Sequence, residues 1–275
     1  MNSNIHVIIC PMKNLKFWHR TINHQTFLFS TKESEEEYYQ LSYELAKKLL
    51  IGMAKRSRVF CSKKYDFVDY PFTYRERQLD TILLPELADL CKGLAFAEYP
   101  VTRNSKKKGH EVDDSKGRID YWCIYKDYSF VIEVKHSYDN FHSNKTNYES
   151  LIQRWQTMNI DQLNNIKGEL KGFGEKTKGI IRIALHFITS ECGKEPSKEI
   201  INDYRSKEKD ILCRLHDDLK NVAEPDFLSV WEIDDNMVLK NDIEGRTYPG
   251  LILISKFYKE IRHKGLVSDS EKLLK

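Results

Sequence analysis

Three residues of the chain have the types and the spacing needed to bind a divalent cation: Asp120, Glu133 and Lys135. Two carboxylates supply the hard oxygen ligands that Mg²⁺ prefers, and waters and a substrate phosphate complete its coordination. A lysine beside such an ion adds positive charge where a phosphate group would lie. The three residues therefore predict metal-assisted chemistry at a phosphate group. The alternative is a solvent-exposed cluster of charges at the ends of two strands.

A β-hairpin is expected to bring these side chains together. Lys126 and Asp127 alone separate two strand-like segments, which is the length of a tight hairpin connection. With that connection Asp120 lies directly opposite Glu133, at a Cβ separation of about 4.5 to 5.5 Å. Because side chains alternate with a period of two, Lys135 lies on the same face. The apolar neighbours expected on this face are Trp122, Ile124 and Val131. They indicate partial burial, where charges are costly unless they are paired or bind an ion.

The sequence Gly-Arg-Ile-Asp at residues 117–120, followed by Glu-Val-Lys at residues 133–135, carries a family resemblance. Together these two segments resemble the motif of the PD-(D/E)XK nuclease superfamily, also called restriction-endonuclease-like. The common core of that superfamily is described as αβββαβ, and the same order of elements is expected here from Tyr74 to Ile188. The chain has Ile119 where the name of the motif has proline, a position that varies widely.

The resemblance implies a metal site and a role for each residue of the motif. Asp120 and Glu133 would hold Mg²⁺ (or Mn²⁺), and the backbone carbonyl of Val134 would be a further ligand. Lys135 would orient the attacking water or stabilise the charge that builds on phosphorus. The implied reaction is the hydrolysis of a phosphodiester bond.

Two further residues are implied on helices. Members of the superfamily often add an acidic residue from the first core helix, and here Glu76 lies near the centre of the apolar stripe of that helix. Glu86, which follows Pro85 on the same side, is the second choice, and an ordinary N-terminal helix acid is the alternative for Glu76. Some branches similar to RecB-type nucleases carry a glutamine on the helix after the E-x-K strand. Gln162 resembles it, although the tyrosine that often follows is absent, and a plain polar helix residue is the alternative.

Hydrophobic periodicity predicts the elements that must position these residues. Ser34 and Glu37 form a capping box at the start of the first helix. In chain order the expected elements are a short strand at His6 to Cys10, helices at Ser34 to Ser57 and Tyr74 to Lys92, strands at Ala95 to Val101, Arg118 to Tyr125 and Ser129 to Lys135, a helix at Tyr148 to Leu170, a strand at Gly179 to Ile188, a helix at Glu199 to Val222, and strands at Phe227 to Ile233 and Leu251 to Phe257.

The predicted fold class is α/β. A mixed central β-sheet is flanked by helices, with an αβββαβ core, an N-terminal helical extension and added C-terminal strands. Residues 1–66 are expected to form the extension with one long helix, residues 67–265 the nuclease-like domain, and residues 266–275 a charged tail.

The net charge does not by itself indicate nucleic-acid binding. The chain has 44 basic and 41 acidic residues, which gives +3, and its pI of about 8.3 is below the value near 9 that marks a basic domain. Local clusters are more informative. Residues expected to hold phosphates or bases are Arg103, Lys106, Lys107, Lys108, Arg118 and Gln162, and a second basic cluster is Lys55, Arg56, Arg58, Lys63 and Lys64. Solvated charged loops are the alternative for both clusters.

These observations predict a metal-dependent nuclease that hydrolyses DNA, with RNA as an open alternative. Fold-level analogy favours restriction, other defence against foreign DNA, or DNA repair. The competing interpretation is a catalytically inactive nuclease-fold module that binds nucleic acid or a partner protein. The longest run without Asp, Glu, Lys or Arg is Met1 to Met12, too short for a membrane span of about 18 residues.

The expected location is the cytoplasm, because no secretory signal is apparent. Association with a membrane is not expected, and the sequence leaves open a homodimer or a partner subunit. The six cysteines have no C-x-x-C pair, so reduced thiols are expected in place of disulfides or zinc ligands.

Overall fold

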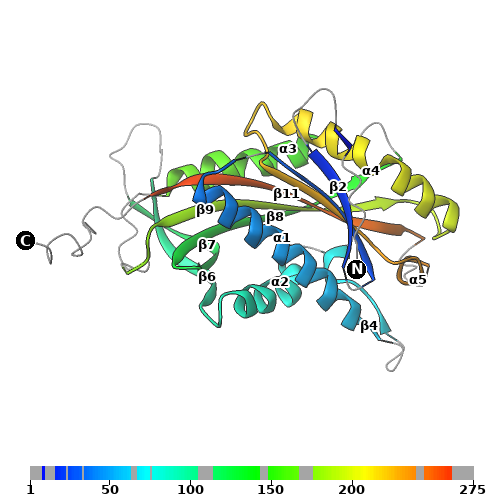
Figure 1. Ribbon diagram of the computed structural model, residues 1–275, viewed down its shortest axis with the longest axis horizontal. Coiled ribbons are helices and arrows are strands. Elements are labelled where there is room, and N and C mark those ends of the chain that lie inside the picture. Colours follow the sequence, from blue (N-terminus) through cyan, green and yellow to red (C-terminus); the bar gives the residue numbers. More distant parts are fainter. Residues whose placement is uncertain are drawn as a thin grey trace, which may run out of the picture.

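A nine-stranded β-sheet forms the centre of the computed structural model (Figure 1). The structure describes residues 8–9, 16–22, 24–32, 34–62, 67–74, 76–104, 114–142, 148–166, 176–239 and 245–261. The strands of this sheet are β1 (Ile8–Ile9), β2 (Lys16–Ile22), β3 (Gln25–Thr31), β6 (Ala95–Asn104), β7 (Asp114–Tyr125), β8 (Tyr128–Asn140), β9 (Ile180–Cys192), β10 (Phe227–Glu232) and β11 (Thr247–Ile261).

The sheet is mixed, which confirms the α/β class. Its strand order is β1-β2-β3-β10-β11-β9-β8-β7-β6. Of the strand pairs described in this sheet, β8 and β9 are parallel and the others are antiparallel. A parallel pair requires a crossover connection, and here the segment that contains α3 (Tyr148–Gln156) links β8 to β9.

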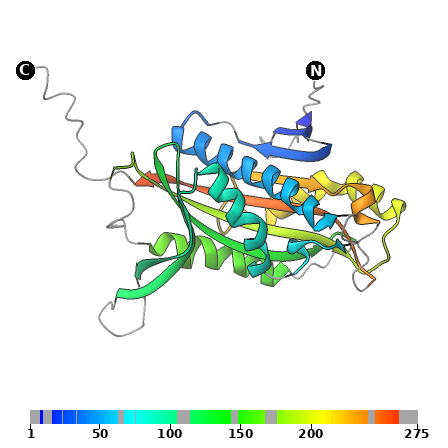
Figure 2. The ribbon, with the colours of Figure 1, turned by 90° about the horizontal axis from the view of Figure 1, so that it is seen from below.

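Helices cover both faces of the sheet (Figures 1 and 2). On one face α1 (Glu37–Ser57) and α2 (Glu76–Leu90) bury leucine-rich stripes in one hydrophobic core, and on the other face α3 and α4 (Lys198–Leu219) contribute to a second core. The short elements are η1 (Arg58–Phe60), β4 (Cys61–Ser62), β5 (Phe67–Val68), η3 (Pro71–Thr73), η4 (Thr157–Gln162), η5 (Leu163–Asn165) and α5 (Asp235–Val238). No described helix combines the length and the apolar character required to cross a bilayer.

The six elements predicted between Tyr74 and Ile188 occur in the predicted order, as α2, β6, β7, β8, α3 and β9. The helix predicted from Tyr74 begins at Glu76, and Pro85 lies inside it. The helix predicted from Tyr148 is shorter than expected. After α3, the π-helical turn η4 and the 3₁₀ turn η5 replace regular α-helix.

The N-terminal segment contains more structure than its sequence pattern indicates. β2 and β3, which were not predicted, form a hairpin, and β3 pairs with β10 in the central sheet. The predicted capping box of Ser34 and Glu37 is wrong. α1 begins at Glu37 without a side-chain cap, and the hydroxyl of Ser34 accepts a hydrogen bond from Glu36 N–H at 3.3 Å.

The predicted tail, residues 266–275, lies outside the described residues. Cys61, Cys91, Cys123, Cys192 and Cys213 are free thiols, and Cys10 is outside the described residues.

Gly250 on β11 allows Tyr204 of α4 to lie directly against the sheet. A Cβ at Gly250 would lie 2.7 Å from two carbons of the Tyr204 ring. That side chain is fully buried, and its hydroxyl is 3.0 Å from Ser190 Oγ. We expect Gly250→Ala to lower the free energy of unfolding by about 1 to 3 kcal/mol, the usual effect of overpacking. Urea denaturation measures this loss. Gly193→Ala is the control, because a Cβ there meets no atom within 4 Å, and equal losses in both variants would contradict the prediction.

Candidate active site

The two-residue turn predicted between β7 and β8 is present. Its residues, Lys126 and Asp127, have φ angles of 47° and 67°, as in the turns that match the twist of antiparallel strands. From this turn the strands pair as far as Tyr121 opposite Ile132. The predicted register is therefore confirmed along this ladder.

The ladder ends one position before Asp120 would meet Glu133. In its place the Asp120 carboxylate accepts a hydrogen bond from the backbone N–H of Val134, with 2.6 Å between Oδ2 and N. Beyond this point β7 remains paired with β6, whereas β8 remains paired with β9, and the two pairs of strands diverge (Figure 2). The ladder thus does not include the expected direct pairing of the two acids.

Lys135 and two acidic residues meet where the strands part. Lys135 Nζ lies 3.4 Å from Glu76 Oε1 and 3.9 Å from Asp120 Oδ2. It also donates a hydrogen bond of 2.9 Å to the carbonyl of Val134. Glu76 is the first residue of α2, where the positive end of the helix dipole favours an acid. Three predicted site residues from α2, β7 and β8 are therefore in one cluster.

The Glu76 carboxyl is in a mixed electrostatic environment. Burial raises its pKa above the ordinary value, and the nearby charge of Asp120 acts in the same direction. The ammonium of Lys135 opposes this, as does a hydrogen bond from the backbone N–H of His136. The balance leaves the pKa of Glu76 raised, which is typical of acids that act at functional sites as well as of structural ion pairs.

Glu133 is fully buried, with 0% exposure, and lies on β8 two residues before Lys135. Its register partner on the parallel strand is Ala184. A carboxylate is rarely buried to this extent because removing its charge from water is costly. Its position places it in the sheet interior next to the cluster and not on a solvated strand end.

The structure distinguishes between the two candidate helix acids. Glu86 forms an ion pair with Arg56 of α1, with 2.8 Å between Oε2 and Nε. Its carboxyl lies where a Cβ on Gly52 would be, so the glycine admits it to the helix interface. Glu86 therefore links α2 to α1, and Glu76 is the acid that contacts Lys135 and lies near Asp120.

The carboxylate oxygens of Glu76, Asp120 and Glu133 are not close enough together to form a compact metal-binding group. Among the described residues, one set of three His, Cys, Asp or Glu side chains has its potential ligand atoms within 4.8 Å of one another, namely His19, Glu208 and Glu232. Glu76, Asp120 and Glu133 are not such a set. Metal binding by these three acids stays a prediction.

The residues expected to contact nucleic acid are described only in part. Arg118 is exposed on β7 and lies 3.5 Å from Glu98. Gln162 is the last residue of η4, and its Oε1 is buried without a hydrogen bond from a described residue. Arg103 pairs through its backbone with Ser115, and its side chain is outside the described atoms. Lys106, Lys107 and Lys108 lie outside the residues that the structure describes.

An aromatic patch on β6 and β7 was missed in the sequence. Phe96 faces Trp122 across the strands, with 5.8 Å between ring centroids, and Tyr99 lies 5.5 Å from Trp122. The Phe96 side chain is 55% exposed, although most large apolar residues of the sheet are buried. The cross-strand register of the two strands was the missing information, because the three residues are not adjacent in the sequence.

A buried polar network supports β8 beyond the cluster. His136 Nε2 is 2.9 Å from Thr189 Oγ1, and His186 Nε2 is 2.9 Å from Ser137 Oγ. Arg154 of α3 donates a hydrogen bond to the carbonyl of His136. These bonds connect β8 to β9 and α3, so they constrain the strand that carries Lys135.

No protein-family model, curated protein or solved structure matches this chain.

The buried histidine of β9 predicts how stability depends on pH. Burial lowers the pKa of His186 from 6.5 to about 3, and the nearby charge of Arg154 contributes. Between these values the unfolded chain binds a proton at this residue and the folded chain does not. The contribution of His186 to stability is therefore largest above pH 6.5 and falls as the pH falls towards 3. We expect His186→Gln to flatten this dependence by up to about 1.4 kcal/mol per pH unit.

Chemical denaturation at several pH values measures this slope. His24→Gln is the matched control, because it removes an imidazole from an exposed turn. A slope that is unchanged in His186→Gln, or changed equally in both variants, would refute the assignment.

Proposed function

We propose that this chain is a metal-dependent nuclease that hydrolyses phosphodiester bonds of DNA. The observation that carries the proposal is the convergence of Glu76, Asp120 and Lys135 where β7 and β8 part. A purely structural hairpin has no need for two acids and an amine at the point where its pairing ends. Such a group is suited to binding a cation and a phosphate together.

The order of elements around this cluster supports the proposal. The acids and the lysine lie on α2, β7 and β8, within the order α2, β6, β7, β8, α3, β9. This is the order described for the PD-(D/E)XK superfamily, which the motif at residues 117–120 and 133–135 resembles. Motif and context support the same interpretation, and context is what gives weight to a short motif.

The donor atoms fit a hard divalent cation in kind. Asp120, Glu133 and Glu76 supply carboxylates, and Val134 supplies a carbonyl, which are the ligand types of Mg²⁺ or Mn²⁺. A positive charge is already accommodated among them, because Lys135 Nζ lies 2.9 Å from the carbonyl and 3.4 Å from Glu76. When bound, the ion lowers the pKa of a water molecule and polarises a phosphate oxygen.

Lys135 has two tasks in this proposal. Its side chain is 16% exposed, so the ammonium is reachable from solvent and is held in place by its neighbours. There it attracts the scissile phosphate and stabilises the negative charge that builds in the transition state. Asp120 holds the backbone of Val134 through its hydrogen bond and thereby positions the adjacent lysine.

The aromatic patch supplies a surface for the substrate. Phe96, Tyr99 and Trp122 form a set of contacting rings on β6 and β7, and Trp122 is two residues from Asp120. Phe96 is the exposed ring of the set, with Trp122 buried beneath it. Exposed aromatic rings stack on unpaired bases, and a nearby arginine such as Arg118 binds phosphate. The patch favours a substrate with single-stranded character near the scissile bond.

Substitution of the lysine tests the proposed activity. Purified full-length protein is incubated with supercoiled plasmid, linear duplex, single-stranded DNA and single-stranded RNA, with Mg²⁺, Mn²⁺ or EDTA. We expect cleavage of DNA that requires the metal and falls at least about 100-fold in Lys135→Ala, because a preorganised charge is lost. Asp120→Asn is expected to lose activity as well. Circular dichroism and thermal melting verify that both variants are folded.

Lys126→Ala is the matched control. This lysine lies on the same hairpin, and its side chain is 50% exposed and pairs with Glu44, a surface contact of small energetic value. It is expected to cleave like the parent. Equal cleavage by the parent and Lys135→Ala would identify a contaminant and contradict the proposal. Tight nucleic-acid binding without cleavage would favour the inactive binding module.

The aromatic patch gives a separate prediction. Phe96→Ala is expected to weaken binding of single-stranded DNA by about tenfold, because the stacking of one base contributes about 1 to 3 kcal/mol. Fluorescence anisotropy with a labelled oligonucleotide and EDTA measures the affinity without cleavage. Val59→Ala removes a side chain that is 73% exposed on η1 and is the control. An affinity unchanged in Phe96→Ala would remove the patch from the proposed substrate path.

A further inference from the structure

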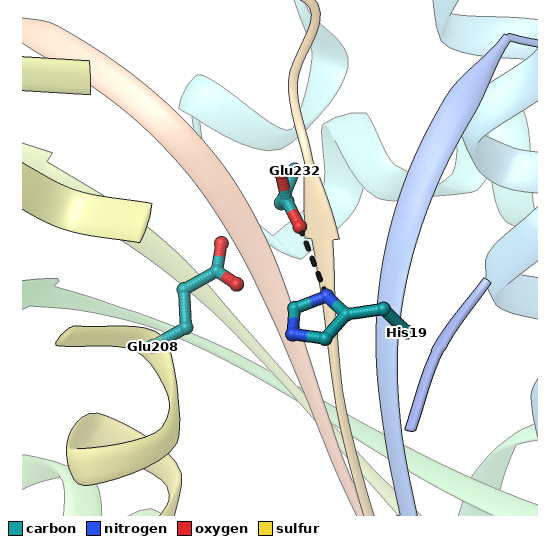
Figure 3. Close-up of side chains that lie close together, drawn as sticks. All are labelled: His19, Glu208 and Glu232. Carbon is teal, nitrogen blue, oxygen red and sulfur yellow. Dashed lines mark ion pairs between the residues drawn. The ribbon is translucent and has the colours of Figure 1, made fainter. Parts of the chain in front are cut away.

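A histidine and two glutamates from distant parts of the chain meet between the sheet and α4. They are His19 on β2, Glu232 on β10 and Glu208 on α4, and their potential ligand atoms all lie within 4.8 Å of one another. Figure 3 shows the Glu208 carboxylate directed towards the imidazole of His19 and the carboxylate of Glu232. We propose that these three side chains bind a divalent transition-metal ion, with Zn²⁺ as the preferred ion.

The buried Glu208 carboxyl is the main evidence for a cation site. The residue is 1% exposed, and neither carboxylate oxygen has a hydrogen-bond partner among the described residues. Burying a carboxylate without donors is costly, and charges buried in proteins are normally paired or coordinate metals. An ion placed among the three side chains would supply the positive charge that this oxygen pair lacks.

The neighbouring charges satisfy Glu232 in preference to Glu208. One oxygen of Glu232 lies 3.5 Å from His19 Nδ1, and the other lies 3.2 Å from Arg205 Nε. Arg205 also pairs with Asp235 at 2.6 Å. The ion pairs of Arg205 are thus with Glu232 and Asp235. Its charge also acts on Glu208 and favours the ionised form of that carboxyl, but the two residues form no ion pair.

The donor set distinguishes between classes of metal. One imidazole nitrogen and two carboxylates suit Zn²⁺, which accepts nitrogen and oxygen ligands and needs only four in total. Mg²⁺ and Ca²⁺ prefer oxygen ligands in larger number. The His19 side chain is 49% exposed, so an ion has access from solvent and a water can occupy the fourth position.

An ion here would be separate from the proposed nuclease cluster. Two of the ligands lie on β2 and β10, the second and fourth strands in the order, whereas β8 and β7 are the seventh and eighth. The ion would link α4 to two strands with β3 between them. Its expected effect is therefore on stability, because a ligand that binds only the folded state stabilises that state.

Metal binding by the full-length protein tests the site. Metal-free protein is titrated with Zn²⁺ by calorimetry, and metal content is measured after gel filtration. We expect one equivalent of Zn²⁺ at this site, with affinity lowered at least about 100-fold in Glu208→Gln and His19→Ala. We also expect Zn²⁺ to raise the melting temperature of the parent and not of these variants. Co²⁺ in place of Zn²⁺ is expected to give visible absorption typical of a four- or five-coordinate site.

Two control variants and a second ligand variant complete the experiment. Asp210→Asn changes an exposed acid on the same helix and is expected to bind Zn²⁺ like the parent. Asp120→Asn is also expected to bind normally, so failure of the proposed nuclease and failure of this site are distinguishable. His19→Ala changes an exposed side chain on β2, which protects the test if Glu208→Gln folds poorly.

Two outcomes would overturn the proposal. In one, the parent takes up no Zn²⁺ beyond that of Glu208→Gln. In the other, the His19→Ala variant binds with parental affinity and stoichiometry. The first result would support the competing arrangement, in which Glu208 keeps a proton beside Glu232, because burial and the charge of Glu232 raise the pKa of Glu208 to about 9. The second result would show that Zn²⁺ binds without His19, at ligands other than the proposed set.

Discussion

The hydrogen bond from Val134 N–H to the Asp120 carboxylate is the interaction on which the candidate site depends. This hydrogen bond lies just beyond the last backbone pairing between β7 and β8. A buried backbone N–H needs an acceptor, and here a side chain supplies it in place of a backbone carbonyl. The strands can therefore part without leaving a donor unsatisfied. The Lys135 side chain meets Glu76 from the start of α2 at this point.

Local signals were sufficient to predict the hairpin and the order of the core elements. The connection of Lys126 and Asp127 determines the register of β7 and β8, because a turn of two residues leaves few alternatives. The end of the ladder was not predictable in this way. It depends on β7 following β6 and β8 following β9, and both are pairings between distant segments. The contact between Glu76 and Lys135 depends on the position of α2, so spacing along the chain could suggest the acid but not its partner.

The errors at the N-terminus have a related cause. β2 and β3 have buried positions at Phe17, Phe27 and Phe29, but polar residues between them weaken the alternation in the sequence. Their place in the sheet depends on the pairing of β3 with β10, a strand about two hundred positions later. The capping box of Ser34 and Glu37 failed because the motif requires the chain to enter the helix at the serine, whereas α1 begins three residues later. Sequence patterns indicated which residues are apolar, and tertiary pairing decided where they lie.

The two acidic clusters of the sheet differ in how their charge is neutralised. In the first, Lys135 contacts Glu76 and lies 3.9 Å from Asp120, so the protein provides an internal cation. A metal ion entering there must compete with that ammonium, which favours an exchangeable ion that binds together with a phosphate. In the second cluster, Arg205 pairs with Glu232, and Glu208 is buried without a hydrogen bond from a described residue. An ion entering there displaces no amine from Glu208, and the buried carboxylate gains the partner that it lacks. Carboxylates removed from water are common to both proposals, and their neighbours distinguish them: a transient ion is proposed at β7 and β8, and a resident ion is proposed beside α4.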